Sequence, residues 1–192
     1  MEESNEKLVT VYQSGEEKAF AELTRRTLPA VYSFVLRFVG DKELAQDIVQ
    51  ETYIKAWSGL KTYDAKKSQF MTWLMRIARN TAVDHLRKKK QVPFSQFDTA
   101  EGKNVLEETV ADEAPLADAL MIQKESSQTL NRAVAALPSG QREVLLLHYN
   151  NRMTFGEISQ VLKLPENTVR SRHHRAVLSL RSMLQGEMLG AF

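Results

Sequence analysis

Residues 154–176, TFGEISQVLKLPENTVRSRHHRA, constrain the fold more than any other segment of the sequence. Thr154 and Glu157 stand three residues apart before an apolar run, which is the pattern of a capping box at the start of a helix. Residues 163–164 predict a tight turn, and Pro165 predicts a second helix, whose first position needs no amide hydrogen. The segment therefore predicts a helix-turn-helix, in which a short capped helix is followed by a longer one.

The longer helix combines an apolar stripe with a basic outer face, because three arginines and two histidines fall within residues 170–175. In a helix-turn-helix the N-terminal half of the second helix enters the major groove of duplex DNA. There arginine suits guanine and asparagine suits adenine, each good pair contributing about 1–3 kcal/mol of discrimination. The side chains predicted to point toward DNA are Glu166, Asn167, Arg170, Ser171, His174 and Arg175, and those predicted to pack inward are Val169, His173, Ala176, Val177 and Leu180.

The alternative to a DNA-binding face is a solvated basic helix that only keeps the protein soluble. The capping box and the proline at the helix start favour DNA binding, since together they complete the motif. Arg172 and Arg181 lie off the outer face, and we expect them to contact phosphates or neighbouring carboxylates.

Most of the remaining sequence has apolar residues at helical spacing, and no segment shows the alternation of a strand. The apolar stripe of residues 20–38 predicts a helix that ends at Gly40, and Asp41 can cap the next helix. In that helix the column Ala45, Val49, Tyr53 and Trp57 is predicted to face inward, and further helices are predicted from about Ser68 to Lys90, over about 120–136 and from Pro138 onward.

Charge is distributed unevenly, with a net charge of +4 over residues 1–94, −6 over residues 95–120 and +4 over residues 121–192. Two basic segments around an acidic one are compatible with a protein that binds a polyanion. The acidic segment has little helical pattern, which predicts a linker, and a short flexible linker permits compact and extended arrangements. The sequence thus predicts an all-α protein of two small helical domains, 1–93 and 120–192, joined by a flexible acidic linker over 94–119.

Composition and motifs exclude several classes of protein. The sequence has no cysteine, which excludes disulfides and thiolate metal sites, and no apolar run approaches the ~18 residues of a membrane span. Its acidic start, MEESNEK, does not resemble a secretory signal, so we expect no membrane insertion and a cytoplasmic location. His173 and His174 diverge by about 100° on a helix, and no HExxH, phosphate-loop or GxSxG motif occurs. We expect no catalytic residues, no metal site and no cofactor.

A second basic surface lies on the helix predicted to begin near Ser68. Arginine and asparagine on an exposed face suit contacts with phosphates and bases, and the loop at 66–68 could hold an unstacked base. Trp73 could stack on a base, although a core position is favoured by about two to one from its burial tendency. Composition leaves the role of this surface undecided. The stripe predicted to lie opposite the core comprises Thr72, Arg76, Asn80, Val83 and Arg87, with Arg79 beside it.

A third polar surface, formed by Asp47, Gln50, Glu51 and Lys55, lies on the preceding helix. From spacing alone, a solvent-exposed face with salt bridges is the better interpretation.

Two stretches of the sequence resemble the bacterial sigma factors of the extracytoplasmic-function type, which direct RNA polymerase to promoters. DKELAQDIVQETYIKAW followed by FMTWLMRIARNTAVDHLRKKK is similar to region two of that family. LPSGQREVLLLHYNNRMTFGEISQVLKLPENTVRSRHHRA is similar to its region four. The two together, in this order and separated by a short acidic linker, are far more specific than either one alone.

The resemblance implies a promoter-specificity subunit that binds core RNA polymerase and promoter DNA, both as a duplex and as the melted non-template strand. It also implies an anti-sigma protein as a regulatory partner. The implied polymerase-binding residues are Asp47, Gln50 and Glu51; those implied for the minus-ten element are Lys66, Lys67, Ser68, Arg76 and Asn80; and the minus-thirty-five element would be read by the outward face of the helix after Pro165.

Two other functions remain as alternatives. An autonomous helix-turn-helix regulator would bind duplex DNA as a dimer, at a palindromic site with symmetric half-site spacing. A helical enzyme with a DNA-binding tail has almost no support from the sequence.

Overall fold

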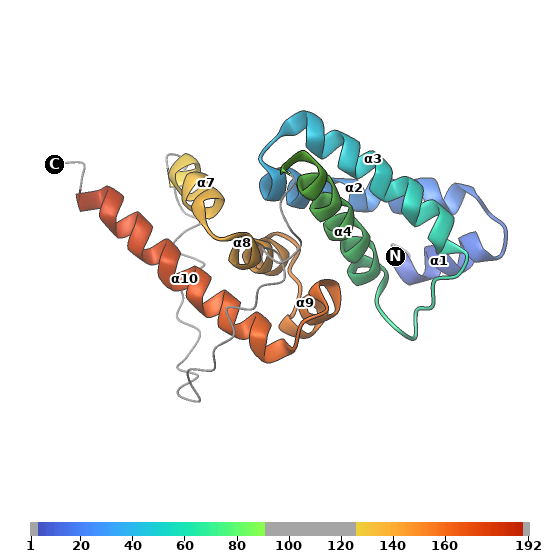
Figure 1. The fold of residues 1–192 in the computed structure, drawn as a ribbon. Helices are drawn as coiled ribbons and strands as arrows, with labels where there is room; N and C mark the ends of the chain where they lie inside the picture. The colour runs from blue at the N-terminus through green and yellow to red at the C-terminus, as the bar shows by residue number, and fades with distance from the viewer. Residues whose placement is uncertain (1–3, 91–125, 190–192) are drawn as a thin grey trace.

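The computed structural model describes residues 4–90 and 126–189, and every element in these two ranges is a helix. The all-α class predicted from the sequence is therefore confirmed (Figure 1). The predicted linker, 94–119, lies outside the described residues. None of the described helices is long and apolar enough to cross a membrane. The N-terminal helices are α1 (Asn5–Gln13), α2 (Lys18–Val39), α3 (Lys42–Leu60) and α4 (Phe70–Lys90); the C-terminal helices are α7 (Ser126–Ala136), α8 (Ser139–Leu145), the π-helix η1 (Leu146–Asn150), α9 (Phe155–Leu162) and α10 (Glu166–Leu189).

Local signals set the junction between α2 and α3 as predicted. Gly40 ends α2 with a φ of 72°, in the left-handed region that glycine adopts without a steric penalty from a side chain. Asp41 caps α3, because its Oδ1 atom accepts a hydrogen bond of 3.1 Å from the amide of Leu44.

The inward column predicted for α3 is correct at its start and wrong at its end. Ala45 is fully buried and Val49 is 6% exposed, whereas Trp57 is 52% exposed. A step of four residues advances about 400° around a helix, so three such steps turn the side chain about 120° away from the first one. The column therefore rotates from the core to solvent along α3.

The helix-turn-helix is confirmed in α9 and α10. Both halves of the capping box are present, since the amide of Glu157 donates to Thr154 Oγ1 at 3.3 Å and the amide of Thr154 donates to Glu157 Oε2 at 2.7 Å. Lys163 then makes the turn in the left-handed region, with a φ of 54°. Pro165 directly precedes α10, and its carbonyl accepts from the amide of Val169 at 3.2 Å.

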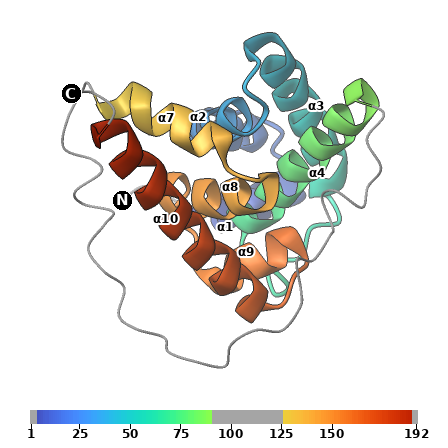
Figure 2. The same ribbon diagram turned by 60° about the vertical axis from the view of Figure 1, so that its left-hand side comes forward.

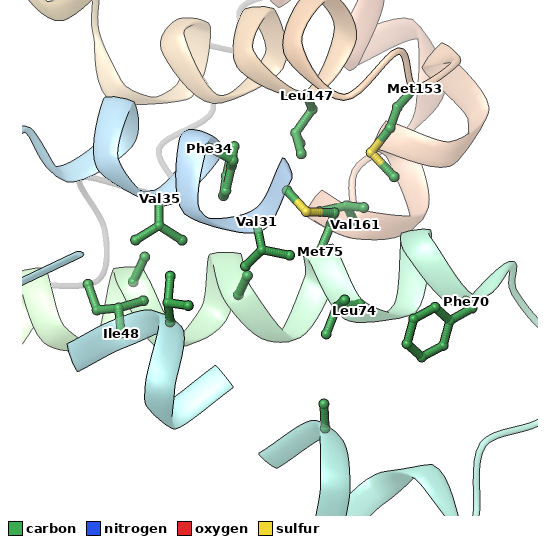
Figure 3. Packing of buried hydrophobic residues seen from close by; sticks show 14 of the residues in the cluster. Val31, Phe34, Val35, Ile48, Phe70, Leu74, Met75, Leu147, Met153 and Val161 are labelled. Atoms are coloured by element: carbon green, nitrogen blue, oxygen red, sulfur yellow. The ribbon is translucent and has the colours of Figure 1, made fainter. Parts of the chain in front are cut away.

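The N-terminal and C-terminal helices share one hydrophobic core, so the two predicted domains pack against each other. Phe34 of α2 and Met75 of α4 are fully buried and face Leu147, Met153 and Val161 of the C-terminal part (Figure 3). Figure 1 and Figure 2 show the fold from two directions, and in both α9 lies beside α4. A separate, smaller cluster holds α7, α8 and α10 together through Ala133, Leu137, Leu145, Ala176 and Leu180.

A buried ion cluster lies across this shared interface. Glu143 of α8 is only 2% exposed, and its carboxylate accepts hydrogen bonds from Arg79 of α4 at 3.0 Å and 3.5 Å. The guanidinium of Arg172, in α10, lies 3.5 Å from the same carboxylate. Gly140 makes room for that guanidinium, since a Cβ atom there would lie 3.0 Å from Arg172 Nη1. Arg172 thus contacts a carboxylate, as predicted, and the carboxylate joins both parts of the chain.

We expect Glu143→Ala to lower the free energy of unfolding by about 3–5 kcal/mol, because it leaves two buried guanidinium groups without their carboxylate. Urea denaturation of the whole chain measures this change. Glu166→Ala is the matched control: it breaks an exposed pair with Arg170, and such pairs contribute about 1 kcal/mol or less. Equal losses in the two variants would contradict the structural role given to Glu143.

Candidate nucleic-acid and protein interfaces

The predicted DNA-contacting side chains lie together on the outer face of α10, which we call the recognition face (Glu166, Asn167, Arg170, Ser171, His174 and Arg175). The first five are exposed and Arg175 is half-buried. Behind this face Val169 and Ala176 are fully buried, and Leu180 is 5% exposed. The division of α10 into an inner apolar stripe and an outer polar face therefore agrees with the sequence prediction.

Arg170 is held on two sides within the recognition face. Glu166 Oε1 accepts hydrogen bonds from Arg170 Nε at 3.1 Å and from Nη2 at 2.7 Å. The ring of Phe155 lies beneath the guanidinium, with 4.8 Å between Cζ and the ring centroid. The side chain of Arg170 is still 52% exposed, so it remains available to a ligand.

The second basic surface surrounds a pocket of about 390 Å³ beside the loop between α3 and α4. Of the residues predicted there, Lys67, Ser68 and Arg76 line the pocket. Lys66 and Asn80 are exposed but lie outside its lining. Five further residues that were not predicted for this surface also line the pocket: Thr62, Tyr63, Asp64, Gln160 and Lys163. Trp73, for which a core position was favoured, lines it as well.

The position of Trp73 is compatible with both of the roles weighed for it. Its ring packs at 5.2 Å from Tyr63 and 5.9 Å from Phe70, at the edge of the core. It also forms part of the pocket wall, where a planar ligand would meet an aromatic surface. A buried packing role and a binding role are therefore compatible at this position.

The loop beside the pocket is fixed by hydrogen bonds that join it to α1. The side-chain amide of Gln13 donates to the carbonyls of Leu60 and Tyr63, at 3.0 Å and 2.9 Å. The Tyr63 hydroxyl donates to the carbonyl of Ser68 at 2.6 Å. Burial, together with the nearby carboxylates of Glu6 and Asp64, raises the pKa of Tyr63 to about 12, so the hydroxyl keeps its proton.

The stripe predicted on α4 is only partly exposed. Thr72 is 2% exposed and Val83 is 3% exposed, so the prediction that they lie opposite the core is wrong. Arg79, at 8%, is buried in the ion pair with Glu143 rather than displayed beside the stripe. The reason is that α2 and α3 cover one side of α4 while α9 covers another. Single-sequence periodicity assumes one buried side.

The third polar surface, which we call the acidic face (Asp47, Gln50 and Glu51), lies on α3. Asp47 and Gln50 are exposed. Glu51 Oε2 lies 2.7 Å from His85 Nε2, and Oε1 lies 2.7 Å from Lys55 Nζ. These hydrogen bonds, with His85 and then Lys55, lower the pKa of Glu51 to about 2. The exposed side chains of Ile54 and Trp57 continue along α3, so an apolar surface adjoins the anionic one.

Groups of three or more His, Asp or Glu side chains with metal-binding geometry do not occur among residues 4–90 and 126–189. The rings of His148 and His173 do meet, with centroids 5.1 Å apart, but in an aromatic cluster with Tyr149 and Phe155.

Residues 23–92 match the family model described as Sigma-70 region 2, and residues 127–180 match the one described as Sigma-70, region 4. The chain is 32% identical to the ECF RNA polymerase sigma factor SigW of Bacillus subtilis (strain 168) over 187 residues, which are 96% of this chain and 99% of that protein. It is 34% identical to the ECF RNA polymerase sigma-E factor of Escherichia coli (strain K12) over 179 residues, covering 93% of each.

Two solved structures share the fold. CnrH in complex with the cytosolic domain of CnrY has a TM-score of 0.69 and 24% sequence identity, covering 96% of this chain and 99% of that one. The sigma factor RpoE in complex with the anti-sigma factor NepR from Bartonella quintana has a TM-score of 0.67 and 24% identity, covering 88% of this chain and 98% of that one.

The contacts of Glu51 give a prediction about its titration. We expect His85→Leu to raise the pKa of Glu51 from about 2 toward the ordinary value of 4.5, because the hydrogen bond from His85 is the largest cause of the lowered value. Carboxyl NMR titration of the two proteins measures the change. Since the folded-state pKa is the lower one, the stabilisation from Glu51 is present above pH 4.5 and is lost as the pH falls toward 2. An unchanged Glu51 pKa in His85→Leu would contradict the contact.

Proposed function

The chain belongs to the extracytoplasmic-function (ECF) sigma factors and is a sigma subunit of RNA polymerase, and we propose how its surfaces divide promoter recognition between them. The observation that carries the proposal is a recognition face exposed on the second helix of a helix-turn-helix, in a chain whose α3 exposes an anionic face elsewhere. We propose a promoter-specificity role without catalytic activity of its own, carried out in the cytoplasm where the polymerase works.

The recognition face reads the minus-thirty-five element. Asn167 and Arg170 belong to residue types that recognise particular bases in the major groove, asparagine suiting adenine and arginine suiting guanine. Both are exposed near the start of α10, the end of a recognition helix that contacts bases. The other members of the face add contacts with bases or phosphates.

The pocket beside the α3–α4 loop, with Lys66 and Asn80 on its outer side, captures a base of the melted minus-ten element. Extruding a base costs a few kcal/mol. A cationic groove with an aromatic wall can offset that cost, because single strands gain from phosphate contacts and from base stacking. Lys67 and Arg76 supply the cations, and Trp73 supplies the aromatic wall.

The acidic face binds the core enzyme. The Glu51 carboxylate is ionised at physiological pH, since its pKa is about 2. Asp47 and Gln50 beside it are exposed. Complementary charge across an interface speeds association and selects the partner. We assign residues 1–93 to the module that binds polymerase and the minus-ten element, 94–119 to an acidic linker, and 120–192 to the module that binds the minus-thirty-five element.

The arrangement in which α9 packs against α4, which we call the closed form, must open when the protein binds a promoter. Elements named minus-ten and minus-thirty-five lie about 25 base pairs apart, which is about 85 Å of straight duplex. Here Gln160 and Lys163 of the helix-turn-helix line the same pocket as Arg76, and Glu166 follows Lys163 by only three residues. Residues 91–125 can span at most about 120 Å when fully extended, so the covalent chain permits the separation.

An anti-sigma protein is the expected regulator. The similar structure of the sigma factor RpoE holds the anti-sigma factor NepR, and that of CnrH holds the cytosolic domain of CnrY. A protein that binds the closed arrangement would oppose the separation that promoter binding needs, because a ligand stabilises the state it binds.

We expect Asp47→Lys to reduce transcription initiated with purified core polymerase by ten-fold or more, because charge reversal replaces attraction at the proposed interface with repulsion. Run-off transcription from a promoter library, together with the affinity for core enzyme, measures the loss. Glu16→Lys is the control, since it makes the same charge change at an exposed residue between α1 and α2.

Arg175→Ala should weaken use of the upstream element and leave core binding intact.

Two results would overturn these assignments. Equal loss of core binding in Asp47→Lys and Glu16→Lys would contradict the acidic face as the polymerase contact. Equal loss of core binding and upstream recognition in Arg175→Ala would contradict its assignment to DNA.

Opening can be followed by energy transfer between two dyes. The chain has no cysteine, so Lys42→Cys and Ala136→Cys provide a unique pair of attachment points, both exposed. They lie near each other in the closed form, because Arg142 donates hydrogen bonds to the carbonyls of both Phe38 and Leu137. We expect high transfer in the free protein and a marked fall when core polymerase and promoter DNA are added. Transfer that stays high in the promoter complex would contradict opening.

A further inference from the structure

The aromatic cluster behind the recognition face consists of His148, Tyr149, Phe155 and His173. Phe155 stacks on His148, with centroids 4.9 Å apart and planes at 15°, and meets His173 edge-on at 5.1 Å. It comes directly after Thr154, the capping residue of α9, so its backbone position is also fixed. The ring therefore has little freedom to turn or shift.

The rings beneath Phe155 are themselves held by hydrogen bonds. His148 Nδ1 lies 2.8 Å from the carbonyl of Met153, a geometry in which the ring N–H donates. The Tyr149 hydroxyl lies 3.1 Å from His173 Nε2. His148 and Tyr149 belong to the π-helix η1, which follows α8 and ends at Asn150, two residues before Arg152, where φ is 54°. Two helices and a turn thus converge to build one rigid support.

The outer face of this support meets Arg170. The guanidinium carbon lies 4.8 Å from the Phe155 ring centroid, within the range of a cation–π contact. Glu166 fixes the same guanidinium from the side through Nε and Nη2. An arginine side chain loses much rotamer freedom when it binds, and a side chain ordered in advance loses less.

We propose that Phe155 is a positioning residue for base recognition, which holds the Arg170 guanidinium in the orientation that it uses on DNA. The proposal rests on the proposed role of Arg170 in reading the upstream promoter element. Phe155 lies behind Arg170 and acts through it. Base selectivity of this sigma factor therefore depends on a residue of α9, outside the recognition helix.

The test measures base discrimination at the upstream element by the complete chain bound to core polymerase. Phe155→Leu keeps an apolar side chain of similar volume but removes the ring face. We expect the preference for the favoured base pair at the position read by Arg170 to fall about two- to five-fold, the size of one partly exposed cation–π contact. Phe155→Tyr keeps the ring and should retain the preference. Affinity for core polymerase should stay unchanged in both variants.

A double-mutant cycle with Arg170→Ala separates the possible outcomes. If Phe155 acts through Arg170, Phe155→Leu causes no further loss of discrimination in the Arg170→Ala background. An unaffected preference in Phe155→Leu, or the same loss in both backgrounds, overturns the positioning role. If Arg170→Ala alone changes discrimination at no position, the proposed function of Arg170 is wrong instead.

A spectroscopic readout keeps the proposal testable without DNA. A proton above an aromatic ring is shifted upfield, so the Arg170 Nε–H signal should move downfield in Phe155→Leu and remain in place in Phe155→Tyr. Leu178→Ala is the matched control, since it removes an exposed apolar side chain from the same helix as Arg170. An Nε–H signal at the same position in Phe155→Leu and the native chain would overturn the contact.

Discussion

The burial of one carboxylate between two arginines is the constraint on which the arrangement of this protein depends. Glu143 comes from α8, while Arg79 comes from α4 and Arg172 from α10. A buried charge is tolerated only with a partner of opposite charge, so this cluster fixes how the three helices lie relative to one another in the closed form. The surrounding apolar contacts are less selective, because hydrophobic burial has no direction. The ion cluster thus determines the relative orientation of the helices, and the shared hydrophobic core contributes most of the free energy that holds the two parts together.

Local sequence signals predicted the helices and the outer face of α10 well, because each depends on neighbours along the chain. The capping box, Gly40 and the stripe of Val169, Ala176 and Leu180 needed no tertiary information. Arg79 and Glu143 were beyond the reach of such signals, since they are 64 residues apart and each alone resembles a surface charge. The predicted burial of Trp57 and the predicted exposure of Thr72 were wrong for a related reason. Periodicity gives the angle between side chains around a helix, but it does not say how many sides of that helix are covered.

The two surfaces proposed to bind DNA differ in how far their side chains are already ordered. On α10, Arg170 is already oriented by Glu166 and Phe155 and faces solvent. The pocket beside α4 is also formed, but one side of it is supplied by Gln160 and Lys163 from the other part of the chain. The proposed opening would leave the contacts around Arg170 unchanged and would remove the side of the pocket formed by Gln160 and Lys163.

The contacts of helix α1 decide which residues a minimal functional fragment must include. The region 2 match begins at Leu23, yet Gln13 secures the carbonyls of Leu60 and Tyr63, and Glu6 accepts from the amide of Phe70. Both ends of the loop between α3 and α4 are therefore tied to a helix that lies before the matched segment. A fragment trimmed to the matched boundaries would keep every cation and ring of the pocket and lose the brace that sets their spacing.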